Sequence, residues 1–107
     1  MYMVQAAYTT EAIATMAKHP QDRSVPMREL IKKLGGRMIG FYFCYGEYDV
    51  VTISELPDDS AATTAALAAM SPGHLKAYKT TKLFTVEETM EAMRKADSIT
   101  FQAPSRG

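Results

Sequence analysis

The chain has 107 residues, of which 47% are hydrophobic and 22% are charged, a size that suits one domain and is short for two. Twelve Lys and Arg balance twelve Asp and Glu, so the formal net charge is +0. Without a basic field or a run of basic residues, the chain lacks the usual means of attracting nucleic acid or an anionic membrane surface.

The first predicted elements are a strand and a helix. Residues 2–8 form a short, mainly apolar run that begins and ends with an aromatic tyrosine and is typical of a strand. Thr9 and Thr10 then offer hydroxyl caps, and Glu11 places a negative charge in the first turn of a helix. We expect this helix to end near residues 19–20, because a residue that precedes proline is disfavoured in helical geometry.

A second helical segment is predicted before the Gly35–Gly36 pair, which ends it. Pro26 fits its first turn. Its apolar side chains recur at the i, i+3, i+4, i+7 spacing of one helix face, and they are Met27, Leu30, Ile31 and Leu34.

The middle of the chain predicts a hairpin. Residues 37–45 are rich in aromatic side chains and indicate a buried strand. Gly46–Glu47 makes a tight turn, and residues 48–56, rich in Val, Ile and Thr, indicate the second strand. Residues 57–60 then break the pairing and cap a helix over residues 61–70.

A fourth strand and a last helix complete the predicted domain. Residues 71–73 end the preceding helix, and residues 75–84 alternate well enough to form a strand. The segment Thr85–Glu88 is a capping box that opens a helix through about residue 96. We expect a single domain over residues 1–97 and a flexible tail over residues 98–107.

This order of elements predicts a ferredoxin-like α+β fold. It is β-α-β-β-α-β with a terminal helix and with the first crossover split into two helices, around a four-stranded antiparallel sheet. Helices in such a fold cover one face of the sheet, so the other face must meet water, a ligand or another subunit.

Strand alternation assigns the side chains of the hairpin to two faces. The helix-facing list is Ile39, Phe41, Phe43, Val51 and Ile53. The opposite list is Met38, Gly40, Tyr42, Cys44, Val50, Thr52 and Ser54, joined by Tyr78, Thr80 and Lys82 from the fourth strand and Gln5 from the first.

The second face is too polar for a core and too apolar for bare solvent. Such a face commonly pairs with its copy in another subunit and leaves a pocket where the two copies do not close fully. We therefore expect a homodimer or a higher oligomer, with a monomer whose face is wetted as the alternative.

Residues 35–51, Gly-Gly-Arg-Met-Ile-Gly-Phe-Tyr-Phe-Cys-Tyr-Gly-Glu-Tyr-Asp-Val-Val, closely resemble the signature of the GYD domain family. These small bacterial proteins are named for a Gly-x-Tyr-Asp-like segment, which here is residues 46–49. The resemblance extends through residues 55–59 and 81–85 and covers most of residues 2–90.

The resemblance implies a ferredoxin-like fold of the dimeric α/β-barrel kind and no established reaction. Proteins that share this fold include cofactor-free monooxygenases, isomerases, haem enzymes and ligand-sensing regulators, so the fold alone does not select a function. Residues 71–76 depart from the plainer Gly-Asn-like turn expected there, and no role for His74 can be carried over.

The Gly46–Asp49 segment has two interpretations. Glycine and aspartate are ordinary turn residues, and Asp49 can accept backbone N–H groups near the hairpin end. Alternatively, Glu47, Tyr48 and Asp49 form a polar rim whose carboxylate orients a ligand or takes a proton.

The imidazoles and the thiol give weak signals for chemistry. His19 and His74 are the only histidines and fall in predicted loops, where exposure is the ordinary outcome and a shared metal requires the two loops to meet. Cys44, the only cysteine, is expected to be a small buried hydrophobe. No hydrolase elbow or phosphate cradle is present, and we expect no cofactor and no metal.

The single cysteine also suits a reducing compartment. The chain carries no basic leader followed by a long apolar stretch, and no run of about 18 apolar residues. We therefore expect a cytoplasmic protein.

The leading functional hypothesis is a homo-oligomeric protein that binds a small organic metabolite in a pocket of the sheet or the subunit interface. The candidate ligand-binding residues are Tyr42, Cys44, Glu47, Tyr48, Asp49, Thr52, His74 and Tyr78. One alternative is a cofactor-independent enzyme of the monooxygenase or isomerase type, in which Tyr42, Tyr48, Tyr78, Asp49 or a histidine transfers a proton. Another is a structural subunit of a larger assembly.

Overall fold

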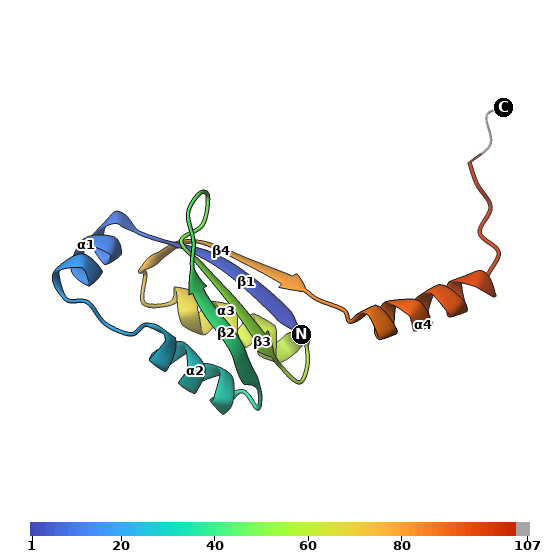
Figure 1. The fold of residues 1–107 in the computed structure, drawn as a ribbon, viewed down its shortest axis with the longest axis horizontal. Helices are drawn as coiled ribbons and strands as arrows, with labels where there is room; N and C mark the ends of the chain where they lie inside the picture. The colour runs from blue at the N-terminus through green and yellow to red at the C-terminus, as the bar shows by residue number, and fades with distance from the viewer. Residues whose placement is uncertain (105–107) are drawn as a thin grey trace.

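The computed structural model describes residues 1–104, and the predicted order of elements is confirmed there. One antiparallel sheet has the strand order β2-β3-β1-β4 (Figure 1). The elements are β1 (Tyr2–Tyr8), α1 (Thr10–Lys18), α2 (Ser24–Lys33), β2 (Arg37–Phe43), β3 (Val50–Glu55), α3 (Asp59–Met70), β4 (Leu75–Lys82) and α4 (Val86–Asp97). The fold is therefore ferredoxin-like, as the sequence predicts.

Helices α2 and α3 lie on one face of the sheet, and Figure 1 shows α1 beyond the end of β1 and α4 extending away from the other elements. The extents of 61 × 36 × 22 Å describe an elongated molecule. The radius of gyration is 18.2 Å, against about 13 Å for a compact chain of about this length. The C-terminal helix accounts for the elongation. None of the helices in residues 1–104 has the length and apolarity needed to span a bilayer.

The helix starts follow the predicted caps. The Thr9 hydroxyl accepts the Ala12 N–H at 3.2 Å, and the Asp58 carboxylate accepts the Ala61 N–H at 2.8 Å. Thr85 and Glu88 close a capping box at α4. These local signals set the element boundaries to within a few residues of the prediction.

A β-bulge in β2 changes which side chains share a face. Met38 pairs with Ser54, but Gly40 pairs with Ile53, so Ile39 is an extra residue without a partner. The extra residue shifts the alternation by one position, and Met38 and Phe41 lie on the same face. Met38 is 6% exposed, whereas Ile39 is 47% exposed.

The predicted faces are wrong for β3, a regular strand that pairs one residue out of the predicted grouping, and for Met38 ahead of the bulge. Directly paired residues share a face, and the β1–β3 and β1–β4 pairs put Tyr2 with both Ser54 and Lys82. The residues under α2 and α3 are accordingly Met38, Val50, Thr52, Ser54, Tyr78, Thr80 and Lys82, all predicted for the opposite face. Val51 and Ile53, predicted to face the helices, lie on the other side with Gln5, Gly40 and Tyr42.

This helix-free side of the sheet is the open face, and its members are Met3, Gln5, Ala7, Gly40, Tyr42, Val51, Ile53, Ala77, Lys79 and Thr81. The Tyr42 ring leans over Gly40, where an added Cβ would come within 2.6 Å of it. A larger residue at position 40 would therefore displace this ring from the open face.

The core lies between the sheet and the helices. Ala6, Tyr8 and Val50 form its buried cluster, and α3 contributes Ala62 and Ala65. The small side chains of α3 bring that helix close to the sheet and fill little volume. This combination leaves space beneath α2.

The bulge predicts that alanine substitutions at two neighbouring positions lower the free energy of unfolding by different amounts. We expect Met38→Ala to lower the free energy of unfolding by about 2–5 kcal/mol, because a buried side chain is removed from the core. Ile39→Ala, which trims an exposed side chain, should change it by less than about 1 kcal/mol. Urea denaturation of both variants measures the difference, and a larger loss for Ile39→Ala would contradict the bulge.

Candidate functional site

A cavity lies between the helix-covered face of the sheet and helices α2 and α3. We call it the chamber, and its volume is about 110 Å³. Its lining residues are Val4, Ala6, Tyr8, Arg23, Pro26, Met27, Leu30, Phe41, Val50, Thr52, Ala69, His74, Leu75 and Tyr78. Most of this wall is apolar, and the polar groups are few.

A wider hollow adjoins the chamber below α1. This vestibule has a volume of about 390 Å³ and is lined by Tyr8, Ala12, Thr15, Met16, Gln21, Arg23, Pro72 and His74. Tyr8, Arg23 and His74 line both spaces. These three side chains therefore lie between the two spaces, and we call them the mouth of the chamber.

The polar groups inside the chamber are hydroxyls. Burial raises the pKa of Tyr78 to about 12, so its phenol stays protonated at neutral pH and can donate a hydrogen bond. Thr52 is buried beside it on the same face of the sheet. The interior of the chamber is thus a neutral, mainly apolar space with two hydroxyl anchors.

His74 is held at the mouth by its backbone and its ring. Its carbonyl oxygen accepts the Thr9 N–H at 2.9 Å, which ties the α3–β4 loop to the end of β1. Its ring stacks on Tyr8 with centroids 6.1 Å apart. Burial, and then the charge of Arg23, lower the pKa of His74 below its ordinary value, so the imidazole is neutral at neutral pH.

Arg23 brings a positive charge to the same mouth. It immediately precedes α2 and is half-buried, and its guanidinium donates to the side-chain amide oxygen Oε1 of Gln21 at 3.4 Å. Within residues 1–104, no carboxylate forms an ion pair with it. Burial raises the pKa of Tyr8, and the Arg23 charge opposes part of that rise. The mouth therefore carries a cation whose counter-ion is not part of the described chain.

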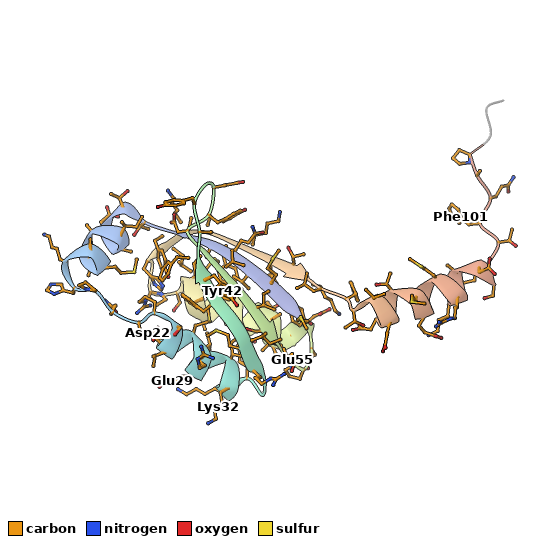
Figure 2. The ribbon with its side chains drawn as sticks, in the orientation of Figure 1. Asp22, Glu29, Lys32, Tyr42, Glu55 and Phe101 are labelled. Carbon is orange, nitrogen blue, oxygen red and sulfur yellow. The ribbon has the colours of Figure 1, made fainter. Side chains whose placement is uncertain are left out.

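Three of the sequence-predicted site residues, Thr52, His74 and Tyr78, meet at the chamber. Cys44 and Asp49 line a different hollow of about 440 Å³ beside α1. Tyr42 is 62% exposed on the open face (Figure 2), and Glu47 is exposed in the β2–β3 loop. Tyr48 is half-buried in the same loop as Glu47, so the predicted set is divided among four places.

Asp49 serves the fold. Its Oδ2 atom accepts the Tyr8 N–H at 2.9 Å, where a register shift between Ala7 and Tyr8 interrupts the β1–β4 ladder. Its own N–H donates to the Ala6 carbonyl at 2.9 Å. The carboxylate that the sequence offered as a rim group therefore clamps the hairpin end to β1 and fixes the strand that carries Tyr8.

The prediction that Cys44 is buried is wrong. Strand β2 ends at Phe43, so Cys44 lies in the exposed loop that follows, with its thiol 3.1 Å from the Tyr48 carbonyl oxygen. The predicted strand had extended two residues too far, because aromatic residues continue beyond the last paired position.

Sequence reasoning missed Tyr8 and Arg23 as site residues. Tyr8 falls at the end of the predicted first strand, and Arg23 falls between the two predicted helical segments, so neither position carries a pattern that by itself indicates a site. The end of β1, the start of α2 and the α3–β4 loop meet only in the folded chain. A charged residue just before an amphipathic helix was the one available signal.

The site holds no evident metal centre. Among the described residues, no three His, Cys, Asp or Glu side chains gather closely enough to hold an ion. His19 lines neither the chamber nor the vestibule. The chemistry available at the mouth is that of a neutral imidazole, a guanidinium and one phenol.

The GYD domain family model matches residues 2–93 of the chain. Comparison with curated proteins and with solved structures finds no match. The family match spans the whole sheet, the helices around the chamber and most of α4.

The contact between the Asp49 carboxylate and β1 is tested by measuring the free energy of unfolding of two variants. We expect Asp49→Ala to lower the free energy of unfolding by about 1–3 kcal/mol, because the Tyr8 N–H loses its acceptor. Glu47→Ala removes an exposed carboxylate from the same loop and should change it by less than about 0.5 kcal/mol. Equal effects in thermal or urea denaturation would mean that the clamp does not hold.

The environment of His74 predicts a pH dependence of stability. Because the folded pKa lies below the unfolded value near 6.5, the unfolded chain takes the proton first. The contribution of neutral His74 to the free energy of unfolding is complete above pH 6.5, and it is lost as the pH falls through the folded pKa of His74. NMR titration should place the His74 pKa below 6.5, and His74→Gln should flatten the stability profile in that range. A folded pKa above 6.5 would contradict this.

Proposed function

The chain belongs to the GYD domain family, and we propose that it binds a small organic acid, with the hydrocarbon part in the chamber and the anionic group at the mouth. The observation that carries the proposal is the half-buried Arg23, which has no ion-pair partner in residues 1–104 and borders an otherwise apolar cavity. A buried or half-buried cation of this kind favours an anionic ligand.

The volume of the chamber limits the ligand. An apolar cavity of about 150 Å³ accepts a benzene ring. The chamber, at about 110 Å³, is smaller, so the buried part of the ligand is at most one small ring or a short branched chain, and the vestibule gives room for a polar group outside it. Tyr78 and Thr52 offer hydroxyls that orient the buried part.

We propose self-association through the open face. Met3, Val51 and Ile53 are half-buried there with no helix above them, which favours a homodimer or a higher oligomer. The chamber lies on the opposite side of the sheet, so the ligand site and this interface are separate. The exposed free thiol of Cys44 is consistent with the reducing conditions of a cytoplasmic location, which we also propose.

His74 supports a second candidate, a cofactor-independent enzyme of the isomerase or monooxygenase type. Its neutral imidazole at an apolar cavity is suited to take a proton from a bound substrate, and Arg23 is placed to stabilise the resulting anion. Binding of an acid without chemical change distinguishes the binding protein from this enzyme. A purely structural subunit would leave the chamber without a ligand.

The charge at the mouth is tested with benzoate and its neutral analogue benzamide. We expect calorimetry to detect benzoate binding, and Arg23→Gln to weaken it at least about tenfold, as expected when a charged hydrogen-bonding group is lost. Benzamide should bind more weakly to the wild type and respond little to the substitution.

Arg28→Gln is the matched control, because Arg28 is exposed on α2 and does not line the chamber. It should leave benzoate affinity unchanged. If Arg23→Gln and Arg28→Gln bind benzoate equally, or if a panel of small acids shows no binding, the proposed function is wrong.

A further inference from the structure

The C-terminal arm, residues 83–101, carries a row of uncovered apolar side chains. Helix α4 contains no buried residue. Val86, Met90 and Met93 recur at i, i+4 and i+7 and so share one face of α4, with Val86 76% and Met93 63% exposed. We call these three residues the α4 stripe. Phe84 before the helix is also exposed. So is Phe101 after it, which Figure 2 labels.

A helix of this length needs a surface to pack on. Isolated helices shorter than about 12–15 residues are marginal in water, and most helices are stabilised by burial of their apolar face. The capping box at Thr85 and the Glu91–Arg94 ion pair at 3.0 Å support α4 only locally. The stripe therefore requires a cover that the described part of this chain does not provide.

The root of the arm is fixed in a direction away from its own sheet. The Leu83 N–H donates to the Met1 carbonyl at 2.8 Å, and the Lys82 ammonium lies 3.1 Å from the Asp59 carboxylate. The same ammonium lies 5.8 Å from the centroid of the Phe84 ring. Figure 1 shows the result, with α4 extending beyond the end of β4 and away from the sheet and the other helices.

The open face supplies a surface of complementary character. Met3, Val51 and Ile53 form its apolar centre, and no helix of residues 1–104 lies over it. Lys79 is exposed at its β4 side and forms no ion pair among the described residues. The first turn of α4 carries the acidic Glu87. When α4 packs across the open face, this carboxylate is available to pair with Lys79.

We propose that the C-terminal arm packs its α4 stripe on the open face of a second copy of this chain, and that the second copy's arm returns the same contact. The proposal extends the self-association proposed above and does not depend on the ligand of the chamber. Each chain carries both an uncovered stripe and an uncovered sheet face. A two-fold dimer therefore covers both stripes and both faces at once.

Charge and area favour a second copy as the occupant. The formal net charge of +0 gives two copies no overall repulsion. The helix of the arm begins with acidic Glu87 and Glu88 and ends with basic Arg94 and Lys95, so two copies that exchange arms offer each other charges of both signs. A stable interface buries about 1,200–2,000 Å² of accessible surface in total. In a reciprocal dimer the contact between one arm and one face occurs twice, which doubles the buried area.

Sedimentation equilibrium of the full chain tests the arm. The double variant Met90→Glu, Met93→Glu places charges on the α4 stripe and should weaken dimerisation at least about a hundredfold. Ala92→Glu places the same charge off the stripe and should leave it unchanged. If the double variant dimerises like the wild type, the arm is not the contact, although self-association through the sheet alone would stand.

Crosslinking of mixed variants tests where the arm lies. In a Cys44→Ser background, Met93→Cys and Ile53→Cys are made in separate chains, mixed, and treated with a short bis-maleimide. The proposal predicts a crosslinked product that contains one chain of each kind. Crosslinks within each variant only, or none, would overturn it, and a monomeric wild type would overturn both this proposal and the self-association. Benzoate binding, measured on the same wild-type sample, reports the proposed function independently.

Discussion

The pairing of β3 with its neighbours decides the character of both faces of the sheet. Thr52 and Val51 are adjacent in the chain, yet Thr52 lies under the helices and Val51 lies on the open face. A shift of one residue would exchange them and would move the buried hydroxyls to the outside. The bulge at Ile39 lets β2 follow this register while it keeps Met38 and Phe41 on the helix side. The chamber and the open face both depend on that arrangement.

Small residues and one unpaired charge then define the site. Helix α3 presents alanines to the sheet, including Ala65 in the core and Ala69 at the chamber wall, and larger side chains there would fill the cavity. The mouth combines a guanidinium with an imidazole that its surroundings keep neutral. An anion at the mouth would offset the Arg23 charge and would favour protonation of His74. Ligand binding and the state of His74 are therefore coupled in this account.

The sequence predicted the fold because its signals are local. The caps at Thr9, Asp58 and Thr85 mark helix starts, and Gly35, with a φ of 82°, ends α2. The faces of the sheet were predicted poorly for two reasons. The bulge at Ile39 breaks the alternation within β2, and the regular strand β3 pairs one residue out of the predicted grouping, with Phe41 opposite Thr52 and not Val51 or Ile53. Thr52 and Tyr78, both predicted as ligand-binding candidates, line the same cavity, but they lie on the other side of the sheet from the one predicted. The mouth could not be predicted, since Tyr8, Arg23 and His74 are far apart in the chain.

The central claim is that a small acid enters the space beneath the helices. Methyl NMR spectra recorded with and without benzoate test it most directly, because Thr52 lines the chamber while the neighbouring residues Val51 and Ile53 lie on the open face. The account predicts large shifts for the methyl groups of Thr52, Met27 and Ala69, with little change at Val51 and Ile53. Shifts confined to Val51 and Ile53, or no shifts at saturating benzoate, would contradict it.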